Sequence, residues 1–148
     1  MKKNLFTIAQ WLLVVLGSIF MGTRVLPKLY IIATTDPPYL YMKQDLAELS
    51  VCAREAGFEF DPPMLRVMKP AYVWGRPHGY AEVWSNVVLL APYASYETIA
   101  HELGHIIDYQ MGQKGHPLFE RYRKSPKLSQ EVADAIRDVI LDTCSTSR

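Results

Sequence analysis

The stretch SYETIAHELGHIIDYQMG, residues 95–112, contains the strongest pattern in the chain and decides how its neighbours must fold. Its apolar residues return every three or four positions, which is typical of the buried face of an α-helix: Ile99, Leu103, Ile106 and Ile107. Ser95 is a suitable N-cap, and Gly112 is a suitable stop. We therefore predict a helix over Tyr96 to Met111.

Short apolar runs bounded by Pro and Gly precede this helix, between Phe58 and Pro92. Their length and composition are typical of β-strands. We predict strands at 64–68, 71–74, 80–84 and 87–91, with a hairpin connection at 75–79 and a turn at Ser85 and Asn86. These strands would form a small, largely antiparallel sheet of three or four strands.

Two more helices are expected, one on each side of this region in the sequence. Asp36, followed by two prolines, has the form of a helix start, and the apolar set of that helix is Met42, Leu46, Leu49, Ala53 and Ala56. A last helix opens at Ser125 and Pro126, with an apolar stripe made by Leu128, Val132, Ala135, Ile136, Val139 and Ile140. The fold class is therefore α+β, in one domain at residues 37–148.

The N-terminal segment has a different composition. Lys2 and Lys3 precede an apolar run from Leu5 to Gly22, which is long for a signal peptide and just long enough for a spanning helix. Residues 1–26 are therefore predicted to be a signal anchor or, as the alternative, a cleaved signal peptide, and 27–36 a linker. The positive-inside rule would place the rest of the chain outside the cytoplasm, membrane-anchored or secreted.

Charge and cysteine content narrow the possible partners. The 148 residues have a formal net charge of +1, which gives no reason to expect nucleic acid as a partner. Cys52 and Cys144 are the only cysteines. In an exported domain they can form one disulfide, but two buried free thiols remain the alternative.

The predicted helix at 96–111 also carries a chemical pattern. His101 and His105 lie four residues apart, so their imidazoles stand on one helix face, about 6 Å apart along the axis, and can converge on one metal ion. Glu102 is rotated away from both rings, so its carboxylate can lie beside the metal as a general base. A zinc ion held by such ligands acidifies bound water, and Glu102 would take the proton of that water and pass it to the leaving amine.

These residues give the chain a resemblance to the zincin metallopeptidases, and among them to the gluzincins, over about 87–138. The resemblance implies a zincin-like fold with zinc bound by His101 and His105 and with Glu102 as the catalytic glutamate. It also implies that 87–91 is the edge strand along which an extended peptide lies. Gluzincins take a third ligand from a downstream glutamate, for which Glu131 is the candidate in this chain.

The alternatives to Glu131 fit the gluzincin pattern less well. Asp108 lies too far along the helix axis from the two imidazoles to bind the metal directly. A salt bridge, or a hydrogen bond to a side chain that binds the metal, is therefore the expected role of Asp108. His116 is a further possible ligand in a loop. Asp134 resembles the acidic residue that holds a ligating histidine, although gluzincins place that residue four positions after the ligand, where this chain has Ala135.

The predicted function is a zinc-dependent peptidase acting on a peptide or protein. His116 and Tyr122, together with Tyr109, are the candidate donors to the developing oxyanion, while His78 has no expected part in catalysis. The alternative is a membrane-tethered binding or regulatory protein with a structural or vestigial zinc site. Glu102 favours the enzyme, because a structural site needs no base.

Overall fold

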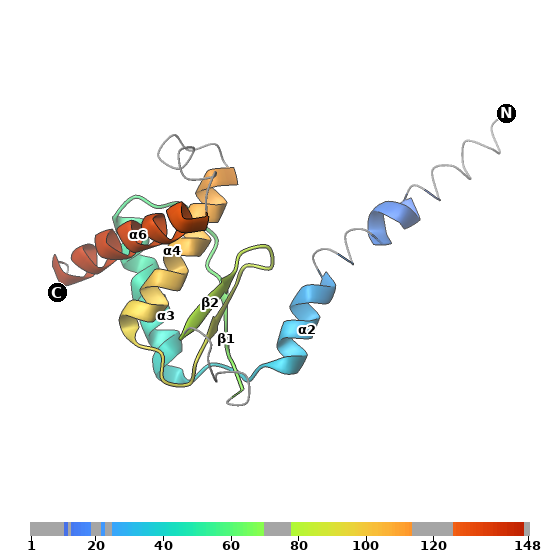
Figure 1. Cartoon of the computed structure of the whole chain (residues 1–148), viewed down its shortest axis with the longest axis horizontal. Coiled ribbons are helices and arrows are strands. Elements are labelled where there is room, and N and C mark those ends of the chain that lie inside the picture. Colours follow the sequence, from blue (N-terminus) through green and yellow to red (C-terminus); the bar gives the residue numbers. More distant parts are fainter. Residues whose placement is uncertain are drawn as a thin grey trace. The chain divides into compact units, whose positions relative to one another are not determined.

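The computed structural model describes residues 11, 13–18, 22, 25–69, 78–113 and 126–146. It divides the chain into two compact units, Met1–Thr34 and Thr35–Arg148. The second unit contains the sheet and three long helices, so the predicted α+β class is confirmed (Figure 1). The predicted strand at 71–74 lies outside the described residues.

Helix α2, Leu26–Thr34, belongs to the first unit and occupies most of the stretch predicted to be a linker. Most of the predicted anchor at 1–26 lies outside the described residues: 1–10, 12, 19–21, 23 and 24. Within the part of the chain that the structure describes, no helix combines the length and apolar character needed to cross a membrane.

Helix α3, Leu40–Glu55, starts later than predicted. Asp36 does not cap it, because the backbone of Asp36 forms an isolated antiparallel bridge with Val67, with both N–H groups donating across it. Tyr39 is the N-cap and makes no side-chain cap bond. The expected apolar face is otherwise confirmed, since Met42, Leu46, Leu49 and Ala53 are all buried.

The sheet contains three described strands, β1 (Met64–Val67), β2 (Gly79–Glu82) and β3 (Val87–Leu90), in the order β1-β3-β2. β2 and β3 are antiparallel, but β1 and β3 are parallel, so the predicted antiparallel sheet is in fact mixed. β3 is the central strand and not the predicted edge, which is why Val87, Val88 and Leu90 have no exposed surface.

Helix α4, Tyr96–Gln113, packs on β2 and β3 and begins at the predicted cap. The Thr98 N–H donates to Ser95 Oγ over 3.2 Å. Its predicted face is buried almost completely, with Ile99, Leu103, Ile106 and Ile107 at most 1% exposed. α4 continues through Gly112 to Gln113, slightly beyond the predicted end.

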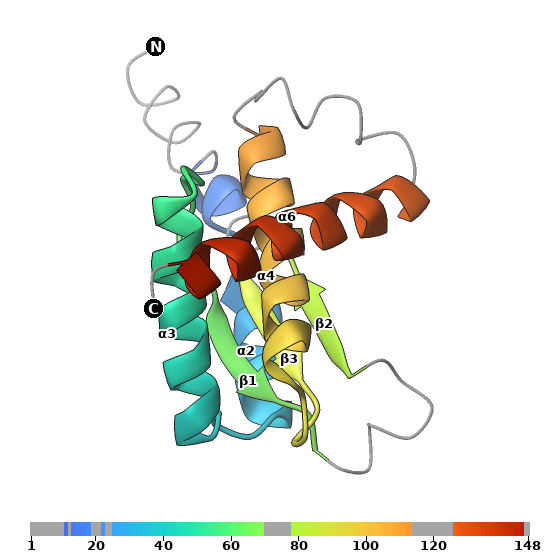
Figure 2. The ribbon, with the colours of Figure 1, turned by 90° about the vertical axis from the view of Figure 1, so that its left-hand side faces the viewer.

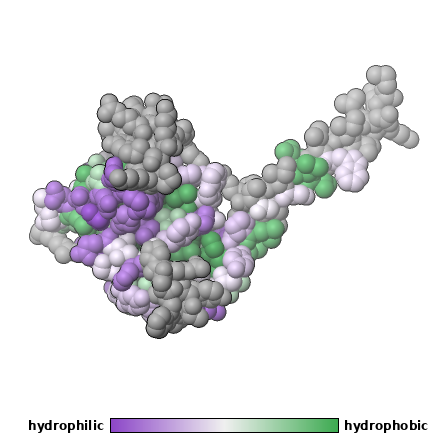
Figure 3. All heavy atoms as spheres, in the orientation of Figure 1, coloured by the Kyte–Doolittle hydropathy of each residue, from purple (hydrophilic) through white to green (hydrophobic). Residues whose placement is uncertain are grey.

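Helix α6, Pro126–Thr146, crosses α4 on the side away from the sheet (Figure 2). Its buried residues are Val132, Ala133, Ile136, Ile140 and Cys144, whereas Ala135 and Val139, predicted to be buried, are exposed. The buried face is therefore rotated from the predicted stripe. The surface over α6 is largely hydrophilic (Figure 3), as its exposed residues Glu131, Asp138 and Asp142 require.

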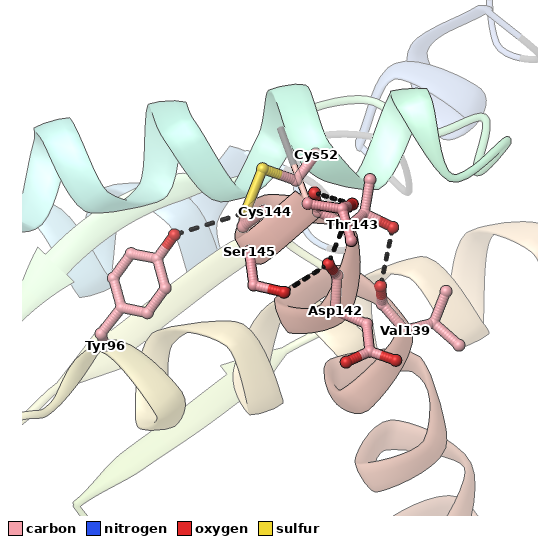
Figure 4. Close-up of a disulfide and its surroundings, with 8 residues drawn as sticks. Cys52, Tyr96, Val139, Asp142, Thr143, Cys144 and Ser145 are labelled. Carbon is pink, nitrogen blue, oxygen red and sulfur yellow. Dashed lines mark hydrogen bonds between the residues drawn. A yellow bond between two sulfur atoms is a disulfide. The ribbon is translucent and has the colours of Figure 1, made fainter. Parts of the chain in front are cut away.

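A disulfide joins Cys144 of α6 to Cys52 of α3, with their Cα atoms 5.3 Å apart (Figure 4). The structure therefore contains the bridge and not the two free thiols that were the alternative. The Tyr96 hydroxyl, from the first turn of α4, donates to Cys144 Sγ over 3.4 Å. All three helices consequently meet at this bond.

Candidate metal centre

Two imidazoles from successive turns of α4 face each other. The Nε2 atoms of His101 and His105 are 3.2 Å apart, and their ring planes are nearly perpendicular, at 89°. Both side chains are partly buried at the wall of a cleft of about 890 Å³. The structure therefore brings the two predicted ligands together with nitrogen atoms aimed at a common point.

The opposite nitrogen of each ring meets a polar side chain of α6. His101 Nδ1 lies 3.0 Å from Asp134 Oδ1, and His105 Nδ1 lies 3.4 Å from Ser129 Oγ. A carboxylate can only accept from the ring, so Asp134 fixes the proton of His101 on Nδ1 and leaves the Nε2 lone pair free. Arg137 Nη1 donates to the same carboxylate oxygen over 2.7 Å and holds it in place.

The third polar atom at the facing nitrogens comes from Gln130, not from Glu131. Gln130 Oε1 lies 3.1 Å from His101 Nε2, and the Gln130 side chain also bonds His105. Glu131 is exposed and does not line the cleft. Because α6 turns by about 100° per residue, Glu131 stands about 170° from the centre of the buried face, on the solvent side. The structure thus does not bring the predicted third ligand to the histidines.

Asp134 and Gln130 also account for the spacing that the sequence left unmatched. The acidic residue that holds a ligating histidine was expected four positions after the ligand, and Asp134 follows Gln130 by four. Gln130 lines the cleft, and Asp134 contacts His101 Nδ1 from the next turn of α6. Gln130 and Asp134 therefore have the four-residue spacing that the resemblance led us to expect between a ligand and its acidic partner, with an amide at the first position.

Glu102 is buried on the other side of the histidine pair. It is only 6% exposed, and the Ala81 N–H donates to its carboxylate. Burial raises the pKa of Glu102 to about 7, and the hydrogen bond from Ala81 offsets part of that rise. Gly79 makes room for this side chain, because a Cβ at residue 79 would lie 2.7 Å from Glu102 Cγ.

The environment keeps His105 suited to ligation. Burial lowers the pKa of His105, and the neighbouring His101 lowers it further, whereas Gln130 and Asp134 act in the opposite direction. A lowered pKa favours the neutral ring, which is the form that binds metal.

Helices α4 and α6 approach closely because α4 has a glycine at the crossing. A Cβ at Gly104 would lie 2.6 Å from the carbonyl oxygen of Ala133. Gly104 separates the two histidine turns, and Ala133 lies between Gln130 and Asp134. The glycine between the two histidines therefore allows α6 to bring its polar side chains onto the rings.

The spacing of the polar atoms fits a tetrahedral zinc ion. Bonds of about 2.0–2.1 Å place neighbouring ligand atoms about 3.3 Å apart, close to the 3.2 Å between the two Nε2 atoms and the 3.1 Å between Gln130 Oε1 and His101 Nε2. No set of three His, Cys, Asp or Glu side chains in the described residues is placed to hold a metal.

The remaining predicted residues divide into two groups. His116 and Tyr122 lie outside the described residues. Asp108 and Tyr109 line the cleft, and Tyr109 stacks at a tilt against Trp84, with ring centroids 5.4 Å apart.

Sequence reasoning missed several lining residues. His78, which was given no part in catalysis, lines the cleft next to the start of β2. Tyr80 of β2 and Arg137 of α6 line it as well. Burial, followed by the nearby Glu82 and Glu102, raises the pKa of Tyr80. The signal that could have found Gln130 was its four-residue spacing to Asp134. Tyr80 and Arg137 had no comparable signal, because their positions depend on tertiary packing.

No protein-family model, curated protein or solved structure matches this chain.

Proposed function

We propose that this chain is a zinc-dependent metallopeptidase of the zincin type, in which His101 and His105 bind the metal and Glu102 is the general base. The observation that carries the proposal is the pair of facing Nε2 atoms, 3.2 Å apart, beside a buried carboxyl group in an open cleft. A structural site would need the nitrogens but not the neighbouring carboxyl.

A zinc ion at this position supplies Lewis acidity, which lowers the pKa of a water molecule toward about 7. The protein's own part is to orient the two rings and to move protons. Asp134 and Ser129 hold the Nδ1 edges of His101 and His105, so that both Nε2 atoms point into the cleft. Glu102 takes a proton on a carboxylate oxygen and returns it to the nitrogen of the leaving amine.

The cleft offers a place for an extended substrate along β2. This strand lies at one edge of the described sheet, and three of its residues line the cleft. Ala81 uses its N–H for Glu102, so this residue faces away from β3. In an antiparallel pair the outward N–H and C=O belong to alternate residues, which also turns the Gly79 backbone outward. A peptide could pair with the Gly79 backbone by strand addition.

The Cys52–Cys144 bridge supports the expected export of this domain, because such bonds persist in oxidising compartments. The donor to the developing oxyanion would come from the cleft wall. Tyr109 is one of the predicted candidates and lies there.

The test is to measure the zinc content and the peptidase activity of wild type, Glu102→Gln and a control, Glu59→Gln, on casein and a peptide library. Glu59 is an exposed glutamate outside the cleft. We expect Glu102→Gln to retain zinc and to lose activity by about 100-fold or more, while Glu59→Gln matches wild type.

Zinc-loaded wild type with no turnover on any peptide would reject the peptidase. It would favour the alternative, a binding or regulatory protein with a structural zinc site, or a hydrolase of non-peptide amides if such a substrate is cleaved.

A further inference from the structure

We infer that the side-chain amide oxygen of Gln130 is the third protein ligand of the metal, so that the site contains no acidic ligand. This inference rests on the proposed zinc site and specifies its ligand set and charge. It differs from the glutamate that the gluzincin resemblance implies.

The position of Gln130 is the first argument. Its Oε1 atom lies 3.1 Å from His101 Nε2, and the same side chain also interacts with His105, so the amide lies against the histidine pair. An amide oxygen has lone pairs available for a cation.

The rotation of α6 is the second argument. The buried residues Val132, Ile136 and Ile140 fix which side of α6 faces α4. That rotation directs Gln130 to the cleft and Glu131 to solvent. To bring Glu131 to the histidines, α6 would have to turn by more than a quarter of a revolution, which would expose those three side chains and break the disulfide geometry at Cys144.

The third argument is that the supporting contacts agree with Gln130 in register. Asp134, one turn after Gln130, bonds His101 Nδ1, and Ser129, the residue before it, meets His105 Nδ1. Three polar side chains of α6 therefore engage the two rings together. If residue 131 were the ligand, Ser129 and Asp134 would still hold the rings, but Gln130, which lies between them in the sequence, would have no role.

An amide ligand changes the charge of the site. Two neutral imidazoles and a neutral amide leave the full charge of a divalent cation uncompensated by any ligand, whereas a carboxylate would cancel one unit. Since opposite charges in direct contact attract strongly, this site should bind zinc less tightly than its carboxylate counterpart. Gln130→Glu should therefore tighten binding.

The experiment is a zinc titration of the full chain, freed of metal, in competition with a chromophoric chelator. The variants are Gln130→Ala and Gln130→Glu, with Glu131→Ala and Glu131→Gln as matched neighbours and His105→Ala as the test of the site itself. Visible absorption of the cobalt-substituted protein gives a second readout of the ligand set, and circular dichroism checks the fold of each variant.

We expect Gln130→Ala to weaken zinc binding by about tenfold or more and Gln130→Glu to strengthen it by about tenfold. Among the α6 variants, only those at Gln130 should change the cobalt spectrum, and both Glu131 variants should match wild type. His105→Ala should abolish tight binding.

Two results would overturn the inference while leaving the proposed function intact: weakening by Glu131→Ala in place of Gln130→Ala, or Gln130 variants that bind zinc as wild type does while His105→Ala does not bind. If the wild-type chain binds no zinc at all, the proposed function fails, and the inference fails with it.

Discussion

Helices α4 and α6 cross each other, but their surroundings differ. α4 is enclosed, with the sheet on one side and α6 on the other, and Ile99, Leu103 and Ile107 are fully buried. α6 packs mainly on α4 and α3, and Glu131 and Asp138 on its outer side are exposed. Side-chain directions on α4 are therefore fixed from two sides, whereas those on α6 depend on how one helix is rotated against its support.

The candidate site needs both helices. α4 supplies the two rings and Glu102, and α6 supplies the groups that orient the rings, Asp134 and Ser129. Features that fix the rotation of α6 should therefore matter for the site even when they do not touch it. The disulfide and the crossing at Gly104 are the two such features.

The largest expected effect comes from removing the disulfide with Cys52→Ser and Cys144→Ser together. The bridge closes a loop with a sequence separation of 92 residues, and loss of the chain-entropy constraint should lower the free energy of unfolding by about 4 kcal/mol. Urea denaturation measures this. Adding reductant should destabilise wild type by a similar amount and leave the double variant unchanged, and a loss below about 1 kcal/mol would contradict the role given to the bridge.

A smaller effect is expected at the helix crossing. In an isolated helix, Gly104→Ala would stabilise by about 1 kcal/mol. Here the new Cβ would meet the Ala133 carbonyl oxygen at 2.6 Å, so we expect the opposite sign, a loss of about 2 kcal/mol in the free energy of unfolding. Thermal or urea denaturation decides the sign.

The control for this crossing is Ala135→Leu, on the exposed side of α6, which should change stability by less than about 0.5 kcal/mol. If Gly104→Ala proved as stable as wild type, the close approach of α4 and α6 would not be needed.

The smallest expected effect is at the orienting carboxylate. Asp134→Asn keeps the shape of the side chain but weakens its bond to His101 Nδ1, so we expect zinc affinity to fall by about tenfold, or about 1.4 kcal/mol. Competition titration with a chelator measures the change.

Asp138→Asn is the matched control for Asp134, because both carboxylates pair with Arg137, whereas the bond to His101 Nδ1 comes from Asp134. Its zinc affinity should stay within about twofold of wild type, as expected for an exposed charge screened by solvent. If both variants lost zinc affinity equally, the ion pairs of Arg137 with Asp134 and Asp138, and not the bond from Asp134 to His101, would support the metal.

The sequence predicted α4 closely because its signals are local. The cap at Ser95, the apolar spacing from Ile99 to Ile107 and the histidine pair all lie within one helix, and helical geometry alone relates them. The turn at Asn86 was also predicted, and its positive φ of 54° is a conformation that asparagine tolerates.

The errors lie where tertiary contacts decide. Counting Ala135 and Val139 as buried rotated the predicted stripe of α6, and this directed Glu131 toward the cleft, where the structure has Gln130. Similarly, an apolar strand such as 87–90 reads as a buried strand, but the sequence does not say which strands lie beside it. The parallel partner β1 therefore could not be anticipated.

The bond between Cys52 and Cys144 has one more consequence. All three strands, all of α4 and most of α6 lie between these two sulfurs in the sequence. A single cut in the backbone anywhere in that interval would leave both pieces covalently attached. A nicked molecule would migrate as one species on a non-reducing gel and separate into fragments only after thiol treatment.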